Sequence, residues 1–275
     1  MIQNNNILNN YKKKFNENGF VILKNALNKK TLTNFSKSLA YLINASSVKG
    51  IRINNIRKKN TEHLKQEILR NLLHLEKKNH SFIAKIYDTI RDLNIMDKVF
   101  NNQKINKLIY SLLSIEDDVP IYVKQKACRI DMPKNNDFSL DWHQESPYTI
   151  KNTDLIQIWA PALENINSEN GAIKILPGSH KEGHLKTEDY FPKIGHAQYV
   201  PKKNILKKYN EKSIELKIGD VMLFSKFLIH RSGENNSFKP RLTFIAHYHN
   251  PIKKDFFKNF IYKGDKPLKK NSYKR

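Results

Sequence analysis

Apolar residues recur at intervals of three and four through much of the first 113 residues. The polar stretch that opens the chain predicts a helix that ends near Gly19, followed by a short strand at residues 20–23. Helical spacing resumes at residues 27–43, and residues 61–113 are mainly helical by the same criterion. Residues 46–60 are basic and rich in asparagine, and they predict a loop. We therefore expect the N-terminal part to supply helices that pack on a main domain.

The pattern changes at about Pro120 to short segments rich in β-branched and aromatic residues. Six of these segments are predicted to be strands: residues 121–131, 155–163, 172–176, 213–217, 221–224 and 242–248. Proline and glycine separate them, at Pro133, Gly171, Pro177, Gly178, Gly219 and Pro240. Many short strands with this punctuation indicate a β-sandwich or a jelly roll.

A chain of 275 residues can bury one substantial core, so a single domain over residues 1–275 is expected. Within it, residues 1–117 form a mainly helical flanking region with one short strand. Residues 118–250 form the β-rich core, and residues 251–275 form a basic and aromatic tail. The predicted fold class is therefore mainly β with flanking helices.

Cysteine usage and hydropathy indicate a compartment. Cys128 is the single cysteine, which excludes an intramolecular disulfide and every cysteine-based zinc or iron–sulfur site. The first residues lack the basic and apolar regions of a signal peptide, and no apolar stretch is long enough to cross a bilayer. A soluble cytoplasmic protein without a membrane span is expected. The sequence does not indicate an oligomeric state.

The formal net charge is +23, which raises the question of a polyanionic partner. Lysine greatly outnumbers arginine, and asparagine and isoleucine are abundant, as in proteins from AT-rich genomes. No helix-turn-helix, zinc-finger or RNA-recognition signature accompanies the charge. We therefore expect no specific nucleic-acid partner, and the charge favours only an anionic small molecule.

Three residues have the chemistry of a metal centre. Residues two apart in a strand project to the same face, so His143 and Glu145 are expected to point together while Gln144 points away. His230 ends an apolar run and precedes a turn-like segment, which places it at the mouth of a barrel. Asp141 also lies two residues from His143, so it competes with Glu145 as the carboxylate.

Two histidines and one carboxylate are the ligand set of a non-haem Fe(II) centre that leaves positions open for a co-substrate and oxygen. Arg241 follows eleven positions after His230 and could anchor an acidic co-substrate. Taken alone, a His-x-Glu pair also arises by chance. The segments around these residues must therefore distinguish a metal centre from a chance pair.

Those segments follow a recognisable order, and the chain resembles the phytanoyl-CoA dioxygenase family of Fe(II)- and 2-oxoglutarate-dependent oxygenases. The similar stretches are residues 15–23, 141–145, 156–164, 169–181, 217–224 and 228–235. The similarity is strong from about residue 120 to 250 and thin in the helical region before it. Several ordered motifs at compatible distances are far more specific than the three metal-ligand candidates alone.

The resemblance implies a double-stranded β-helix (cupin-like jelly roll), with His143, Glu145 and His230 as ligands of Fe(II). It further implies that Arg241 forms a bidentate pair with the distal carboxylate of 2-oxoglutarate. Three further residues match or approximate co-substrate positions of the family: Ser232, Trp159 and Gln125. Each also has an ordinary structural reading, as a turn residue, a core residue and an exposed strand residue respectively. The implied partners are molecular oxygen and a small-molecule substrate.

The chain departs from the family at one position, because aspartate is usual where Glu145 stands. Glutamate keeps the charge and the oxygen donors but adds a methylene, so iron binding is expected to survive. Retention of a carboxylate argues against a halogenase.

Two other classes of function are compatible with a jelly roll. One is an inactive binding protein for a ligand or polyanion, and the other is a cupin-type metal-dependent isomerase or hydrolase. Binding of iron and 2-oxoglutarate would argue against the first, and oxygen-dependent succinate release would exclude the second. The fold alone does not choose a substrate.

Overall fold

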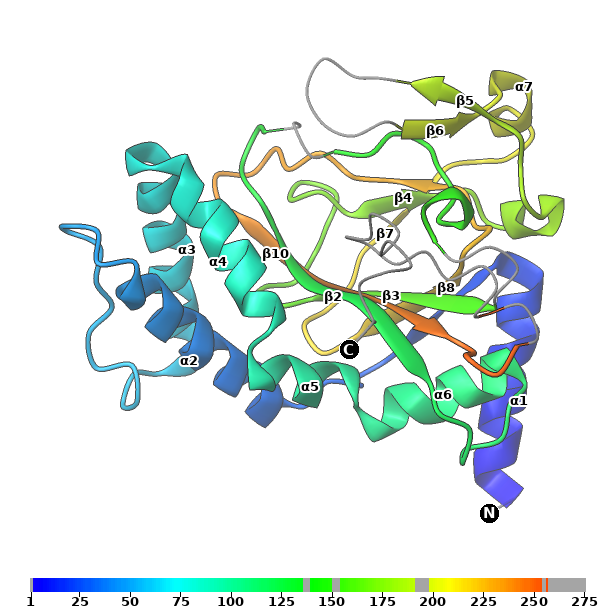
Figure 1. Cartoon of the computed structure of the whole chain (residues 1–275), viewed down its shortest axis with the longest axis horizontal. Coiled ribbons are helices and arrows are strands. Elements are labelled where there is room, and N and C mark those ends of the chain that lie inside the picture. Colours follow the sequence, from blue (N-terminus) through cyan, green and yellow to red (C-terminus); the bar gives the residue numbers. More distant parts are fainter. Residues whose placement is uncertain (1, 136–138, 150–153, 191–197, 254–255, 257–275) are drawn as a thin grey trace, which may run out of the picture.

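The computed structural model describes residues 2–135, 139–149, 154–190, 198–253 and 256. Within these ranges most helices come first and the strands follow (Figure 1). The helices are α1 Ile2–Asn18, α2 Lys29–Ala45, α3 Thr61–Lys78, α4 His80–Arg91, α5 Asn94–Phe100, α6 Gln103–Leu113 and α7 Lys203–Leu206, with 3-10 turns at Ser146–Tyr148 and Ser179–Glu182. The strands are β1 Phe20–Leu23, β2 Tyr122–Asp131, β3 Leu155–Pro161, β4 Ile173–Ile175, β5 Thr187–Tyr190, β6 Gln198–Pro201, β7 Lys212–Ile214, β8 Val221–Ser225, β9 His230–Arg231 and β10 Arg241–His249.

Asparagine side chains begin several of the N-terminal helices. The side-chain oxygen of Asn28 accepts a hydrogen bond from a backbone N–H in the first turn of α2, and Asn60, Asn79 and Asn102 do the same for α3, α4 and α6. Such caps satisfy N–H groups that have no partner inside the helix. The helical stretch predicted at residues 61–113 is therefore divided into four helices, with two of the divisions at capping asparagines.

Two antiparallel sheets form the core. The major sheet has the strand order β1-β8-β3-β10-β2, and the minor sheet has the order β7-β4-β9. The N-terminal strand β1 belongs to the major sheet, since Phe20 pairs with Phe224 of β8. Helices α2 to α5 lie along one side of the major sheet in Figure 1. This arrangement confirms the predicted jelly-roll core with flanking helices.

Strand β3 contributes side chains to two hydrophobic cores, one on each face of the major sheet. Ile156, Ile158 and Ala160 belong to the large core that the sheet shares with the helices. Trp159 points the other way, into the smaller core that lies between the two sheets. Every residue of this strand is buried, because helices cover one face and the minor sheet covers the other. The helices thus pack on the outer face of the major sheet, and its inner face, which is turned towards the minor sheet, can carry a site.

Several short elements carry no clear signal in the sequence. Strands β5 and β6 pair with each other and are largely polar, β9 has only two residues, and α7 is a single turn. Segments this short do not complete the alternation that identifies a strand. Most of the predicted C-terminal tail lies outside the described residues, but Phe256 is buried against Tyr122 and His249. Among the described residues, no helix combines the length and apolar character needed to span a membrane.

Candidate metal centre

The structure brings His143, Glu145 and His230 together between the two sheets. One ligand atom from each residue lies within 4.8 Å of the others, and all three side chains are buried. Oε1 of Glu145 lies 3.6 Å from Nε2 of His143 and 3.4 Å from Nε2 of His230. Within the described ranges, this is the one group of three or more His, Cys, Asp or Glu residues with such spacing.

The two histidines are held side by side by their own backbones. The N–H of His143 donates to the carbonyl of His230 at 2.9 Å, and the N–H of His230 donates back to the carbonyl of His143 at 3.0 Å. This reciprocal bridge brings their rings to 4.2 Å between centroids. The position of both ligands is therefore fixed by main-chain hydrogen bonds.

The expectation that His143 and Glu145 share one regular strand is wrong in its local geometry. His143 forms an isolated bridge, whereas Glu145 has helical backbone angles (φ −72°, ψ −20°) and precedes the 3-10 turn at Ser146–Tyr148. Gln144 does point away, as predicted. Its buried amide donates to the carbonyls of Gly183 and Phe227 and accepts from the N–H of Leu185.

The ring orientation of both histidines suits a metal. Nδ1 of His143 lies 2.6 Å from the carbonyl of Asp141, and Nδ1 of His230 lies 2.9 Å from the carbonyl of Leu228. A carbonyl only accepts, so each Nδ1 carries the hydrogen and each Nε2 keeps its lone pair. Metal-binding histidines have this outer contact as a rule, because it fixes the tautomer.

Of the two carboxylates that compete in the sequence, the geometry favours Glu145. The side chain of Asp141 is exposed, and its Oδ1 accepts a hydrogen bond from the N–H of Trp142 at 2.7 Å. Glu145 is only 8 % exposed and faces both histidines. Burial would raise the pKa of Glu145, but the closeness of His143 and His230 to its carboxylate outweighs that effect and holds this pKa well below its usual value.

A further histidine, which the sequence pattern does not single out, faces the same carboxylate. Nε2 of His247 on β10 lies 3.5 Å from Oε2 of Glu145, and the His247 side chain is 2 % exposed. Burial lowers the pKa of His247, as it does for His230. Both rings are therefore favoured in their neutral form.

The three candidate ligands line a cavity of about 210 Å³ between the sheets. Its other walls are Gln125, Arg129, Leu140, Tyr148, Gln157, Trp159, Gly171, Ile173, Ser232, Gly233, Arg241, Ile245 and His247. Two buried polar atoms among these walls, Oε1 of Gln157 and Nδ1 of His247, have no hydrogen-bond partner. Buried polar atoms are nearly always satisfied, so the cavity has the character of a site for a polar ligand.

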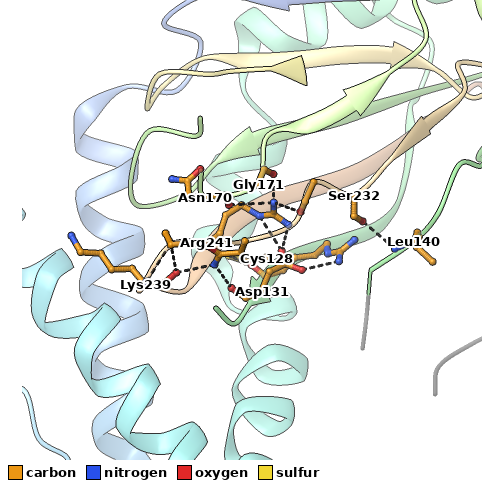
Figure 2. A network of polar contacts seen from close by, with 12 residues as sticks. Cys128, Asp131, Leu140, Asn170, Gly171, Ser232, Lys239 and Arg241 are labelled. Atoms are coloured by element: carbon orange, nitrogen blue, oxygen red, sulfur yellow. Dashed lines mark hydrogen bonds and ion pairs between the residues drawn. The ribbon is translucent and has the colours of Figure 1, made fainter. Parts of the chain in front are cut away.

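Arg241 lines this cavity, but its guanidinium is already engaged (Figure 2). Its Nη2 pairs with Oδ2 of Asp131 at 2.9 Å, and its Nε donates to the same oxygen at 3.3 Å. Its Nη1 donates to the backbone carbonyls of Gly171 and Gly233. The bidentate edge expected to meet a co-substrate therefore faces Asp131.

Arg129, which the sequence did not predict as a site residue, lies beside this pair on β2 and also lines the cavity. Its Nη2 contacts Oδ1 of Asp131 at 2.8 Å. Asp131 thus carries one negative charge between two arginines, and the group keeps a net positive charge. The alternation of β2, which places Arg129 and Asp131 on one face, was the signal that could have identified them.

The other predicted co-substrate residues also line the cavity. The hydroxyl of Ser232 accepts a hydrogen bond from the N–H of Leu140 at 3.2 Å, as Figure 2 shows. Trp159 combines its cavity position with packing in the inner core. Gln125 is an exposed residue with φ +53°, at the point where the pairing of β2 and β10 shifts. Such a bulge turns a side chain in a direction that a regular strand does not allow.

Comparison with known proteins identifies the family of this chain. The sequence model described as Phytanoyl-CoA dioxygenase (PhyH) matches residues 15–243. The chain belongs to the phytanoyl-CoA dioxygenase family. The predicted resemblance is therefore confirmed over most of the chain.

Individual known proteins match shorter parts of the chain. The Dictyostelium discoideum phytanoyl-CoA dioxygenase domain-containing protein 1 homolog is 31 % identical over 172 residues, which are 60 % of this chain and 58 % of that protein. Human peroxisomal phytanoyl-CoA dioxygenase is 32 % identical over 111 residues, 38 % of this chain and 32 % of that enzyme. The 1-deoxypentalenic acid 11-beta-hydroxylase of Streptomyces arenae is 33 % identical over 102 residues, 36 % of this chain and 35 % of that enzyme. The chain therefore spans less than two thirds of the length of each of these relatives.

Solved structures agree on the fold. The epimerase SnoN from nogalamycin biosynthesis, in complex with Fe3+, alpha ketoglutarate and nogalamycin RO, superposes with a TM-score of 0.62 at 15 % identity. That match covers 96 % of this chain and 94 % of SnoN. The alpha-ketoglutarate-dependent carbocyclase SnoK superposes with a TM-score of 0.56 at 14 % identity, covering 93 % and 91 %. At these identities the likeness establishes the shared fold.

Proposed function

We propose that this phytanoyl-CoA dioxygenase family member is an Fe(II)- and 2-oxoglutarate-dependent dioxygenase that hydroxylates a C–H bond of a small molecule. His143, Glu145 and His230 would hold the iron. The observation that carries the proposal is the convergence of two Nε2 lone pairs and one carboxylate oxygen inside a buried cavity. This donor set is the facial arrangement of non-haem iron oxygenases, and it leaves coordination positions open.

When bound, iron together with 2-oxoglutarate and oxygen supplies the oxidising chemistry, and succinate and CO2 are released. The chain's own task is to bind, orient and exclude water. The reciprocal backbone bridge of His143 and His230 holds the ligands before the metal arrives. The cavity is partly open, and its buried walls limit the access of water and of other reductants to the reacting centre.

The co-substrate end of the cavity is proposed to lie at Arg241. Its Nε–Nη2 edge is shared with Asp131, so the distal carboxylate of 2-oxoglutarate would bind next to that edge, with Arg129 adding a second positive charge. Ser232, Trp159 and Gln125 would complete this end, through a hydroxyl, an apolar wall and an amide. Charge-assisted hydrogen bonds from arginine to a carboxylate are among the strongest available for this purpose.

The substrate is proposed to be a small metabolite or natural-product intermediate, and the formal net charge of +23 favours an anionic one. The unpaired amide oxygen of Gln157 lines another part of the same cavity. Because that oxygen only accepts hydrogen bonds, it suits a substrate that also carries a hydroxyl or N–H group.

The test is a screen for succinate release across candidate metabolites, with purified protein, Fe(II), 2-oxoglutarate and oxygen. Wild-type protein should also give the visible charge-transfer band of an iron–2-oxoglutarate chelate under anaerobic conditions. His230→Ala should lose the band and the turnover while keeping its circular dichroism spectrum, since the change removes a ligand from a cavity wall. A well-folded wild-type protein that takes up iron and 2-oxoglutarate without this band would overturn the proposal.

A further inference from the structure

The two carboxylate oxygens of Glu145 face different partners. Oε1 faces the Nε2 atoms of His143 and His230, at 3.6 Å and 3.4 Å. Oε2 faces Nε2 of His247 at 3.5 Å. The group of mutually close donor atoms contains the first three residues and does not contain His247. One carboxylate is thus shared between a metal site and a third histidine outside it.

His247 reaches this position from the opposite sheet. It lies on β10, which pairs with β3 and β2, and its register partners are Gln157 and Lys124. The shift in pairing between Ile245 and His247 places a bulge of β2 beside this part of β10. The side chain is almost completely buried, so the contact with Glu145 is shielded from solvent.

Glutamate has one more rotatable bond than aspartate, and it can offer a metal either one oxygen or both. Each additional free torsion costs conformational entropy when the ligand is fixed. An outer partner on one oxygen removes this freedom and determines which oxygen meets the metal. A longer carboxylate ligand therefore depends on an outer contact more than a short one does.

We propose that His247 is a positioning residue that holds Oε2 of Glu145, so that Oε1 alone is presented to the metal. The tautomer follows from the surroundings, because Nε2 faces a carboxylate and Nδ1 has no partner that would accept its hydrogen. The inference rests on the proposed function, since it assigns Glu145 as a metal ligand. It explains how the chain accommodates glutamate at this position.

The test measures metal affinity, with Co(II) as an oxygen-stable probe that is followed by its visible absorption. His247→Leu should weaken Co(II) binding about 10- to 100-fold, the usual cost of losing an outer-shell partner. His247→Gln should retain most of the affinity, because its amide N–H can donate to the carboxylate although it is a poor metal ligand. If His247 were itself a metal ligand, glutamine would not rescue binding, and that result would overturn the proposal.

His249 provides a matched control on the same strand. It is also fully buried, but its Nε2 lies 3.4 Å from the hydroxyl of Thr149, whereas the carboxylate of Glu145 faces His143, His230 and His247. His249→Leu should therefore leave Co(II) affinity unchanged once both variants are compared at equal folded fraction by circular dichroism. Equal losses of affinity in His247→Leu and His249→Leu would show a general packing effect and contradict the proposal.

A double-mutant cycle with Glu145→Asp isolates the contact itself. The shorter aspartate should not reach His247, so His247→Leu should cost less than about threefold in the Glu145→Asp background. A full loss in that background would contradict the inference. Failure of the wild type to bind Co(II) would overturn the proposed function together with it, whereas tight wild-type binding with an unaffected His247→Leu variant would overturn this inference alone.

Discussion

Arg241 keeps its charge inside the protein because oxygen atoms surround it. The carboxylate of Asp131 and three backbone carbonyls, those of Asn170, Gly171 and Gly233, accept hydrogen bonds from its guanidinium. Two of these three residues, Gly171 and Gly233, have no side chain. A Cβ on Gly171 would clash with Nη1 of Arg241 and with the carbonyl of Gly233. The glycine that the sequence suggested as a turn residue is therefore also needed for space.

Gly171→Ala should destabilise the protein and weaken 2-oxoglutarate binding together. The backbone at Gly171 has φ +96°, which costs an L-residue about 1–2 kcal/mol, and the clash with Arg241 adds to that cost. Gly183→Ala is the matched control, because Gly183 has φ +67° and no atom within 4 Å of the added Cβ. Urea denaturation and co-substrate titration should separate the two variants, and equal effects in both assays would contradict the role in placing Arg241.

At the scale of elements, the sequence predicted the six core strands and the first strand because apolar alternation and turn residues mark their limits. β1 Phe20–Leu23 matches its prediction, and β8 Val221–Ser225 differs by one residue. The local error at His143 and Glu145 has an identifiable source. Ser146 and Pro147 follow directly and begin a 3-10 turn, which ends the extended conformation one residue earlier than a period of two assumes.

The contact partners of the site were not predictable from one sequence. Asp131 on β2 meets Arg241 on β10 only because these two strands pair in a particular register, and the position of His247 beside Glu145 depends on the same pairing. Register depends on turn geometry and on packing between distant segments, which a local pattern does not contain. The domain boundaries proposed for the chain stay a prediction.

Asp131 joins β2 to β10 electrostatically as well as by backbone pairing, since it is the register partner of Arg241. Burial would raise its pKa, but Arg129 and Arg241 outweigh this and lower it. The pKa of an aspartate in the unfolded protein is about 3.9, and that of Asp131 in the folded protein is lower. The ionised carboxylate therefore stabilises the fold fully above the unfolded-state pKa, and this stabilisation is lost as the pH falls through the folded-state pKa.

Asp131→Asn should therefore cost about 3 kcal/mol at pH 7, because the buried Arg241 and the partly exposed Arg129 lose their shared counter-charge. The difference in unfolding free energy between wild type and variant should shrink as the pH falls below about 4. Urea denaturation at several pH values measures it. A difference that is independent of pH would show that the carboxylate charge is not what stabilises this contact.

At the scale of the whole molecule, the helices and the site lie on opposite faces of the major sheet. The large core joins helices to the outer face, and the cavity opens on the inner face towards the minor sheet. The flanking region therefore contributes stability without contacting the metal residues. Its apolar residues recur at helical spacing and are buried in the large core, as expected for a layer that packs on the sheet.

The reciprocal backbone bridge between His143 and His230 has a kinetic consequence. Because main-chain hydrogen bonds, which do not involve the ring nitrogens, join the two ligand residues, capture of an ion should need no folding step and should follow simple bimolecular kinetics. Removal of the metal by a chelator should leave the circular dichroism spectrum and the amide exchange of these two residues nearly unchanged. Collapse of the spectrum on chelation would contradict this. If the spectrum is unchanged on chelation, the protein acts as a preformed receptor, which could lose its iron to a competitor and regain activity within the time of mixing.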